Sequence, residues 1–224
     1  NSSLLAENGV SFTPPPMDGL TRVFVAADGQ FVGTIAIADR IKADAPSAIG
    51  RLRGLGVDKT VMLSGDAAGP AQRVAQEVGI DEVHAELLPE DKVAKLEAII
   101  AEGRNPRGKG KLAYIGDGIN DAPVLTRADV GIAMGGMGSD AAIEAADVVL
   151  MTDEPMKLVQ AIKIARYTHK IVLQNIIFAL AVKGLVLILG AGGLANLWEA
   201  VFADVGVALI AVLNAMRILR KEYK

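Results

Sequence analysis

Two aspartates and an asparagine stand close together in one glycine-opened stretch, Gly116-Asp117-Gly118-Ile119-Asn120-Asp121-Ala122-Pro123. Two carboxylates at this spacing can bind a hard cation such as Mg²⁺ that also keeps water and phosphate ligands. We expect Asp117 to be the closer ligand and Asp121 to support it, while Asn120 hydrogen-bonds a phosphoryl oxygen or positions a carboxylate. The sequence therefore predicts a Mg²⁺ site that handles phosphate.

Alternating strands and helices are expected to position this stretch. The apolar segments and turn residues predict strands over 22–27, 31–38, 60–63, 83–87, 111–115, 130–134 and 147–150, and helices over 41–55, 69–78 and 89–102. Asp28-Gly29 predicts a hairpin between the first two strands. The later strands imply right-handed crossovers and a parallel α/β sheet, whose carboxyl edge carries the chemistry. Ser64-Gly65-Asp66 and Gly116-Asp117 both fall at that edge.

The last quarter of the chain has a different composition, being almost continuously apolar over 171–219. Residues 171–191 and 194–216 are each long enough to cross a bilayer as helices, with a short glycine-rich turn between them. Basic residues flank both outer ends, which predicts that both ends lie in the cytoplasm. Two buried helices of a large soluble core are the alternative, but such matched basic flanks are hard to explain that way.

Three charged residues fall within or near these apolar spans. Lys183 and Asp204 lie at similar depth, about nine and eleven residues from the turn, so they could form an ion pair. The pair could merely fix the helix register, or Asp204 could bind a transported cation with Lys183 as its counter-charge; the cost of burying charge favours the cation site. Glu199, nearer the turn, could lie on the ion path or be an interfacial carboxylate.

The composition excludes several other classes of function. The 224 residues include no cysteine, which rules out disulfides and thiolate metal sites within the chain, and a net charge of −3 without a dense basic face argues against nucleic acid as a partner. The first residues are no signal peptide. They also lack an initiator methionine and begin in the middle of a pattern, which suggests a fragment.

The stretch 116–123, together with Pro89-Glu90-Asp91-Lys92, resembles the P-type ATPases, whose phosphorylation domain has the haloacid-dehalogenase fold. The resemblance implies that Lys92 contacts the phosphorylated aspartate and neutralises charge during transfer. Ser64-Gly65-Asp66 aligns with the family's Thr-Gly-Asp, whose hydroxyl and backbone amide hold the phosphoryl group. Ala67 replaces the usual asparagine, which leaves one nucleotide-side contact open.

The membrane end resembles one branch of that family, the heavy-metal-transporting (type IB) pumps, in which two helices follow the phosphorylation domain. Lys183 and Asp204-Val205-Gly206 resemble the zinc/cadmium/lead exporters, whereas the Met-Ser-Ser sequence expected of copper exporters is absent. A hard carboxylate also suits a divalent ion better than Cu(I). The resemblance thus implies Mg²⁺ and ATP as cofactors and Zn²⁺, Cd²⁺ or Pb²⁺ as cargo, with Co²⁺ as an alternative.

The resemblance also implies a domain order and partners. Residues 1–20 would be the tail of a nucleotide-binding domain, 21–168 the C-terminal part of the phosphorylation domain, and 169–224 two transmembrane helices. The family's Asp-Lys-Thr-Gly-Thr and Cys-Pro-Cys sequences are absent from this chain. We therefore expect it to be inactive alone and to need a lipid bilayer and the N-terminal part of the pump, with its other membrane helices and its actuator and nucleotide-binding domains, in the plasma or inner membrane.

Two further interpretations stay open. A membrane-tethered phosphatase of the same fold would need its own nucleophilic aspartate. Asp28 and Asp39 are the early strand-associated candidates, and neither stands in an Asp-x-Asp context. A truncated, non-catalytic gene product would carry the same motifs, so only the upstream reading frame could exclude it.

Overall fold

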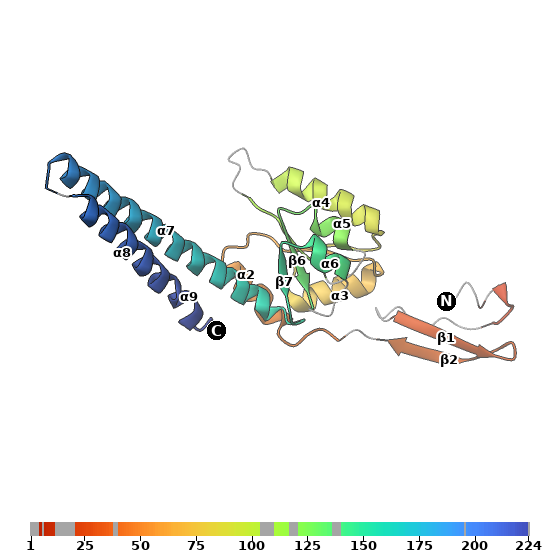
Figure 1. Cartoon of the computed structure of the whole chain (residues 1–224). Helices are drawn as coiled ribbons and strands as arrows, with labels where there is room; N and C mark the ends of the chain where they lie inside the picture. Colours follow the sequence, from red (N-terminus) through yellow and green to blue (C-terminus); the bar gives the residue numbers. More distant parts are fainter. Residues whose placement is uncertain are drawn as a thin grey trace. The chain divides into compact units, whose positions relative to one another are not determined.

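The computed structural model describes residues 5, 7–11, 21–37, 40–103, 110–116, 121–135, 140–194 and 196–223 (Figure 1). The chain divides into two compact units, Asn1–Lys157 and Leu158–Lys224. The first unit is α/β and the second is a pair of long helices, as the sequence predicts.

The first unit opens with an antiparallel hairpin of β1 (Thr21–Ala27) and β2 (Gln30–Ile37). Asp28 and Gly29 between them have φ values of 51° and 76°, which is what a two-residue type I′ turn requires. The rings of Phe24 and Phe31 lie 6.5 Å apart on the paired strands. The predicted hairpin is confirmed.

Two short parallel sheets follow, and each is connected through helices. In the first, β3 (Val61–Leu63) pairs with β4 (Glu82–His84) across α3 (Ala68–Val78). In the second, β5 (Ala113–Gly116), β6 (Val130–Met134) and β7 (Val148–Leu150) pair in that order. The remaining helices of this unit are α2 (Ala45–Gly54), α4 (Pro89–Gly103), α5 (Ala122–Leu125) and α6 (Asp140–Ala145). The core is built from small and branched side chains, among them Ala71, Leu96, Val124, Leu125 and Ile132.

The start of α2 differs from the sequence prediction, which placed it at residue 41. The helix begins at Ala45, with Asp44 at its N-cap position and Pro46 in its first turn. Proline fits there because its missing N–H is not needed by the helix. Lys42, ahead of the helix, forms an ion pair with Asp153.

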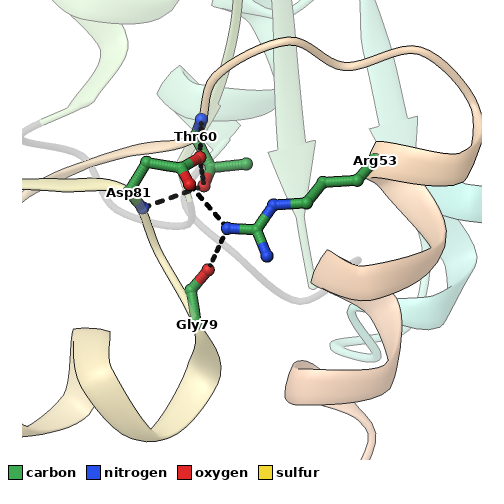
Figure 2. A network of polar contacts seen from close by, with 4 residues as sticks. All are labelled: Arg53, Thr60, Gly79 and Asp81. Carbon is green, nitrogen blue, oxygen red and sulfur yellow. Dashed lines mark hydrogen bonds and ion pairs between the residues drawn. The ribbon is translucent and has the colours of Figure 1, made fainter.

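A polar network holds the end of the first sheet opposite to its carboxyl edge (Figure 2). The Asp81 carboxylate accepts hydrogen bonds from the amide and hydroxyl of Thr60, at 2.8 and 2.7 Å, and from Arg53 at 2.6 Å. Arg53 also donates to the carbonyl oxygen of Gly79 at 2.6 Å. The bonds from Thr60, and then the Arg53 guanidinium, lower the pKa of Asp81 to about 2. The network ties α2 to the segments that precede β3 and β4.

The second unit is a helical hairpin. Helix α7 (Met156–Ala191) is unbroken for 36 residues, and α8 (Leu197–Ala215) returns beside it, followed by the short α9 (Arg217–Arg220) (Figure 1). Both 156–191 and 198–220 are long and apolar enough to cross a membrane. Asn196 and Glu199 form a reciprocal capping box at the start of α8. The domain limits expected from the sequence remain a prediction.

Candidate functional site

Of the acidic stretch 116–123, the structure describes Gly116 and residues 121–123. Asp121 is the N-cap residue of α5 and is only 9% exposed. Asp117 and Asn120, the other two residues predicted for this site, lie outside the described residues, as does Asp39. The geometry of the predicted Mg²⁺ site therefore rests on Asp121 and on the groups around it.

A lysine from α4 reaches this carboxylate. Lys92 Nζ donates to Asp121 Oδ1 at 2.9 Å, and both side chains are largely buried, with 17% and 12% exposure. The hydroxyl of Tyr114, on β5, donates to the same oxygen at 3.0 Å. Two segments that are 29 residues apart in sequence thus meet at one carboxylate oxygen, and the sequence prediction that Lys92 belongs to the site is consistent with this geometry.

The backbone around Asp121 is closely packed. A β-carbon added to Gly116 would lie 2.8 Å from Asp121 Cβ and 2.9 Å from Asp121 Oδ2. Real side chains do not approach so closely, so only glycine at the end of β5 allows the carboxylate to lie against the strand. This contact gives a physical reason for the first glycine of the motif.

The Ser64 motif follows β3 and is closed by its own hydrogen bonds. Ser64, 8% exposed, donates from its hydroxyl to Asp66 Oδ2 at 2.8 Å and accepts from the Asp66 amide at 3.1 Å. The carbonyl oxygens of Ser64 and Asp66 accept from the amides of Leu87 and Glu86, at 3.0 and 2.9 Å. These hydrogen bonds fold the motif into a tight turn.

Loop 85–88, which donates backbone hydrogen bonds to the Ser64 motif, leads into α4, the helix that carries Lys92. The sequence predicted a strand as far as residue 87, but β4 ends at His84 and Glu86 adopts a positive φ of 59°. The strand ends here because the amides of Glu86 and Leu87 donate hydrogen bonds to the Ser64 motif instead of continuing the sheet. The carboxylate of Asp91 then accepts from the Leu88 amide at 3.0 Å, which stabilises the first turn of α4. Loop 85–88 thus links the Ser64 motif to Lys92.

The two charges in the apolar helices, which could form an ion pair or a cation site by their depth, are both exposed. Lys183 lies on α7 and Asp204 on α8. Among the residues that the structure describes, no ion pair or hydrogen bond joins them, and no group of three or more histidine, aspartate or glutamate residues could hold a metal ion. Glu199 accepts from the amide of Asn196 at 2.8 Å and so caps α8.

The contacts between α7 and α8 instead involve amide side chains that the sequence reasoning missed. Asn175 donates to the carbonyl oxygen of Ala211 at 3.1 Å, and Asn214 donates to Asn175 Oδ1 at 2.8 Å. Arg217 donates to Asn214 Oδ1 at 2.9 Å. The signal was available, since asparagines in apolar spans need partners. Tyr114 was also missed, although it lies two residues before Gly116 on the same face of β5.

Comparisons with known proteins place this geometry in context. Residues 13–129 match the family model of the haloacid dehalogenase-like hydrolases. The chain is 61% identical over 200 residues to the zinc-transporting ATPase of Synechocystis sp., a match that covers 89% of this chain and 27% of that protein. It is 53% identical over all 224 residues to the cadmium, zinc and cobalt-transporting ATPase of Bacillus subtilis, covering 31% of that protein.

The structural comparison agrees with the sequence comparisons. A crystal structure of a zinc-transporting PIB-type ATPase in its E2.Pi state superposes with a TM-score of 0.77 at 41% identity, over 98% of this chain and 34% of that one. The chain thus spans about a third of the length of the proteins it matches, and it corresponds to their C-terminal part.

Proposed function

Because the chain belongs to the haloacid dehalogenase-like hydrolases and to the heavy-metal-transporting P-type ATPases, we propose that it is the C-terminal part of an ATP-driven exporter of Zn²⁺, Cd²⁺ or Pb²⁺. The pump would work through an aspartyl-phosphate intermediate. The observation that carries this proposal is the buried Lys92–Asp121 pair beside the carboxyl end of β5. Co²⁺ is the alternative cargo, because the Bacillus subtilis relative is a cadmium, zinc and cobalt-transporting ATPase.

The chain's own residues suit phosphoryl transfer. The ammonium group of Lys92, held beside Asp121, would neutralise charge that develops on the phosphoryl group. The Ser64 hydroxyl and the amide of Gly65 would bind phosphoryl oxygens, and the bond from Ser64 to Asp66 would have to yield for this. Asn120 would orient the group.

The donor set near Asp121 fits Mg²⁺. Its carboxylate Oδ2 lies against the bare backbone of Gly116, while Lys92 and Tyr114 occupy Oδ1. Asp117 and Asp121 would hold the ion, which when bound supplies positive charge to the phosphoryl oxygens. Hard oxygen ligands are what this cation prefers.

The rest of the pump would supply what the described sheets lack. Within the described residues, no ladder joins the β3–β4 sheet to the β5–β6–β7 sheet. Edges of β3 and β5 are thus available to a strand from elsewhere in the pump, and the phosphorylated aspartate would come from there as well. We therefore assign 21–168 to a phosphorylation domain and 169–224 to two membrane helices, with residues 1–20 as the tail of a nucleotide-binding domain.

The membrane part supports an orientation and a cargo site. Basic residues at both outer ends of the helical hairpin would keep the ends of the chain on the cytoplasmic side of the plasma or inner membrane. Asp204 would offer carboxylate oxygens to the transported ion, with Lys183 as the counter-charge. Their exposure in this chain is compatible with packing against other membrane helices of the pump.

Phosphorylation of the full-length protein tests this function. Membranes that contain it, incubated with γ-³²P-ATP and Mg²⁺, should retain acid-stable, hydroxylamine-sensitive label, and Zn²⁺, Cd²⁺ or Pb²⁺ should stimulate ATP hydrolysis. The 224-residue chain alone should retain no label. Label on the isolated chain, or metal-independent hydrolysis by the complete protein, would contradict the proposal.

A further inference from the structure

Tyr114 lies in the middle of β5 and shares a strand face with Gly116, because alternate residues of a strand point the same way. Both residues touch Asp121. The Tyr114 hydroxyl donates to Oδ1, and the backbone of Gly116 lies against Oδ2 and Cβ. The carboxylate therefore lies along the strand, with Oδ1 toward residue 114 and Oδ2 toward residue 116.

This orientation distinguishes the two carboxylate oxygens. β5 runs from Ala113 to Gly116, which is its carboxyl end, so Oδ2 is the oxygen nearer the carboxyl edge, where ligands bind in parallel sheets. Oδ1 accepts two hydrogen bonds, from Lys92 at 2.9 Å and from Tyr114 at 3.0 Å. Among the described residues no hydrogen bond reaches Oδ2, which leaves this oxygen for a metal ion or its bound water.

The backbone of Asp121 is fixed independently of its side chain. In the β5–β6 ladder Tyr114 pairs with Gly131, and a β-carbon on Gly131 would lie 2.5 Å from the carbonyl oxygen of Leu125, the last residue of α5. Helix α5 therefore packs directly against β6 at Gly131, the residue that pairs with Tyr114, and Val124 and Leu125 are buried. Packing of α5 fixes the position of the Asp121 backbone. The hydrogen bonds from Lys92 and Tyr114 fix the orientation of its carboxylate.

We propose that Tyr114 is a positioning residue for the Mg²⁺ site, an inference that rests on the proposed phosphorylation function. The ammonium of Lys92 sits on a flexible stem and can follow the carboxylate, or leave it for a phosphoryl group. The Tyr114 hydroxyl sits on a rigid ring carried by β5, the strand that α5 contacts, so it holds the carboxylate orientation when Lys92 moves. Groups that orient metal ligands in this way tune the affinity for the ion.

The test is Tyr114→Phe in the full-length protein, with Mg²⁺ alone as the probe. Phenylalanine keeps the ring and removes only the hydroxyl. We expect the Mg²⁺ concentration that half-maximally stabilises the protein against thermal unfolding to rise about ten- to a hundredfold, the effect of losing one group that orients a metal ligand. The Mg²⁺ dependence of phosphoenzyme formation should shift equally, with half-saturating ATP unchanged.

Tyr167→Phe is the matched control, because Tyr167 packs its ring against Tyr223 in the helical hairpin. It should leave the Mg²⁺ midpoint at the wild-type value. An unchanged midpoint in Tyr114→Phe, whatever its unfolding temperature without Mg²⁺, would overturn the positioning role. So would a wild-type protein that Mg²⁺ does not stabilise. If the Mg²⁺ midpoint shifts as expected in Tyr114→Phe but the wild-type protein forms no phosphoenzyme, only the proposed function is contradicted.

Discussion

Asp121 and Asp204 are both carboxylates to which the sequence assigns a cation, yet their surroundings differ. Asp121 is 9% exposed and receives two hydrogen bonds on one oxygen. Asp204 is exposed on α8 and, within the described part of the chain, has no hydrogen-bonding or ion-pair partner. A carboxylate buried with its partners belongs to a site assembled by this chain. A carboxylate in an apolar span without partners needs groups from elsewhere, because an unpaired charge in a membrane is costly.

The largest effect is expected from disrupting the site around Asp121. Lys92→Ala in the full-length pump should lower the rate of phosphoenzyme formation about 10²- to 10³-fold, the effect of removing one preorganised charge-stabilising group. Rapid-quench labelling with γ-³²P-ATP measures it. Lys95→Ala, three residues further along the same helix, is the control and should stay near wild type. Similar losses in both variants would show a general effect of α4 on folding.

The next largest effect is expected from disrupting the cation site proposed at Asp204. Asp204→Ala should abolish the stimulation of ATP hydrolysis by Zn²⁺, while phosphorylation of the full-length pump by inorganic phosphate, which needs the phosphorylation domain and not the transported ion, stays within about twofold. Glu199→Gln removes a charge from the same helix at its cap and should keep the stimulation. If Zn²⁺ stimulation survived intact in Asp204→Ala, the cargo site would lie elsewhere.

A smaller effect tests the packing that distinguishes Asp121. Gly116→Ala places a methyl group where Asp121 Cβ and Oδ2 lie, at 2.8 and 2.9 Å, so the carboxylate or the strand must shift. We expect a loss of about 1–3 kcal/mol in the free energy of unfolding and weaker binding of Mg²⁺. Denaturant unfolding and Mg²⁺ titration measure the two. Gly50→Ala, in α2 with no atom within 4 Å of the new methyl group, should cause neither loss.

The smallest effect concerns the remote network around Asp81, which should matter for stability and not for chemistry. The pKa of Asp81 is lowered to about 2 from the ordinary value of 3.8, so its contribution to the stability of the fold is fully present above pH 4 to 5 and is lost as the pH falls through 2. Asp81→Asn should therefore lower the unfolding temperature at pH 7, and the difference from wild type should shrink below pH 4. Phosphoenzyme formation at pH 7 should be unchanged; a loss there would connect this network to the site.

The sequence predicted the elements with strong local signals. Asp28-Gly29 specifies its own hairpin turn, and β6 follows from a short apolar run, so both are found where they were expected. The long apolar helices follow from composition alone. Prediction failed where distant contacts decide, as at Glu86, which bonds to the Ser64 motif and so ends β4 early. It also missed the four-residue α5, whose two fully buried residues depend on tertiary packing.

The sequence by itself determined the family, the α/β class and the helical hairpin, because each depends on residue types at short spacing; the phosphate-handling roles of its motifs stay a prediction. Only the tertiary structure decided that Lys92 and Tyr114 converge on one oxygen of Asp121, that Asn175 and Asn214 join the two apolar helices, and that Glu199 caps α8. Hydrogen bonds between segments depend on distances of a few ångströms. The chain sets those distances only when it packs.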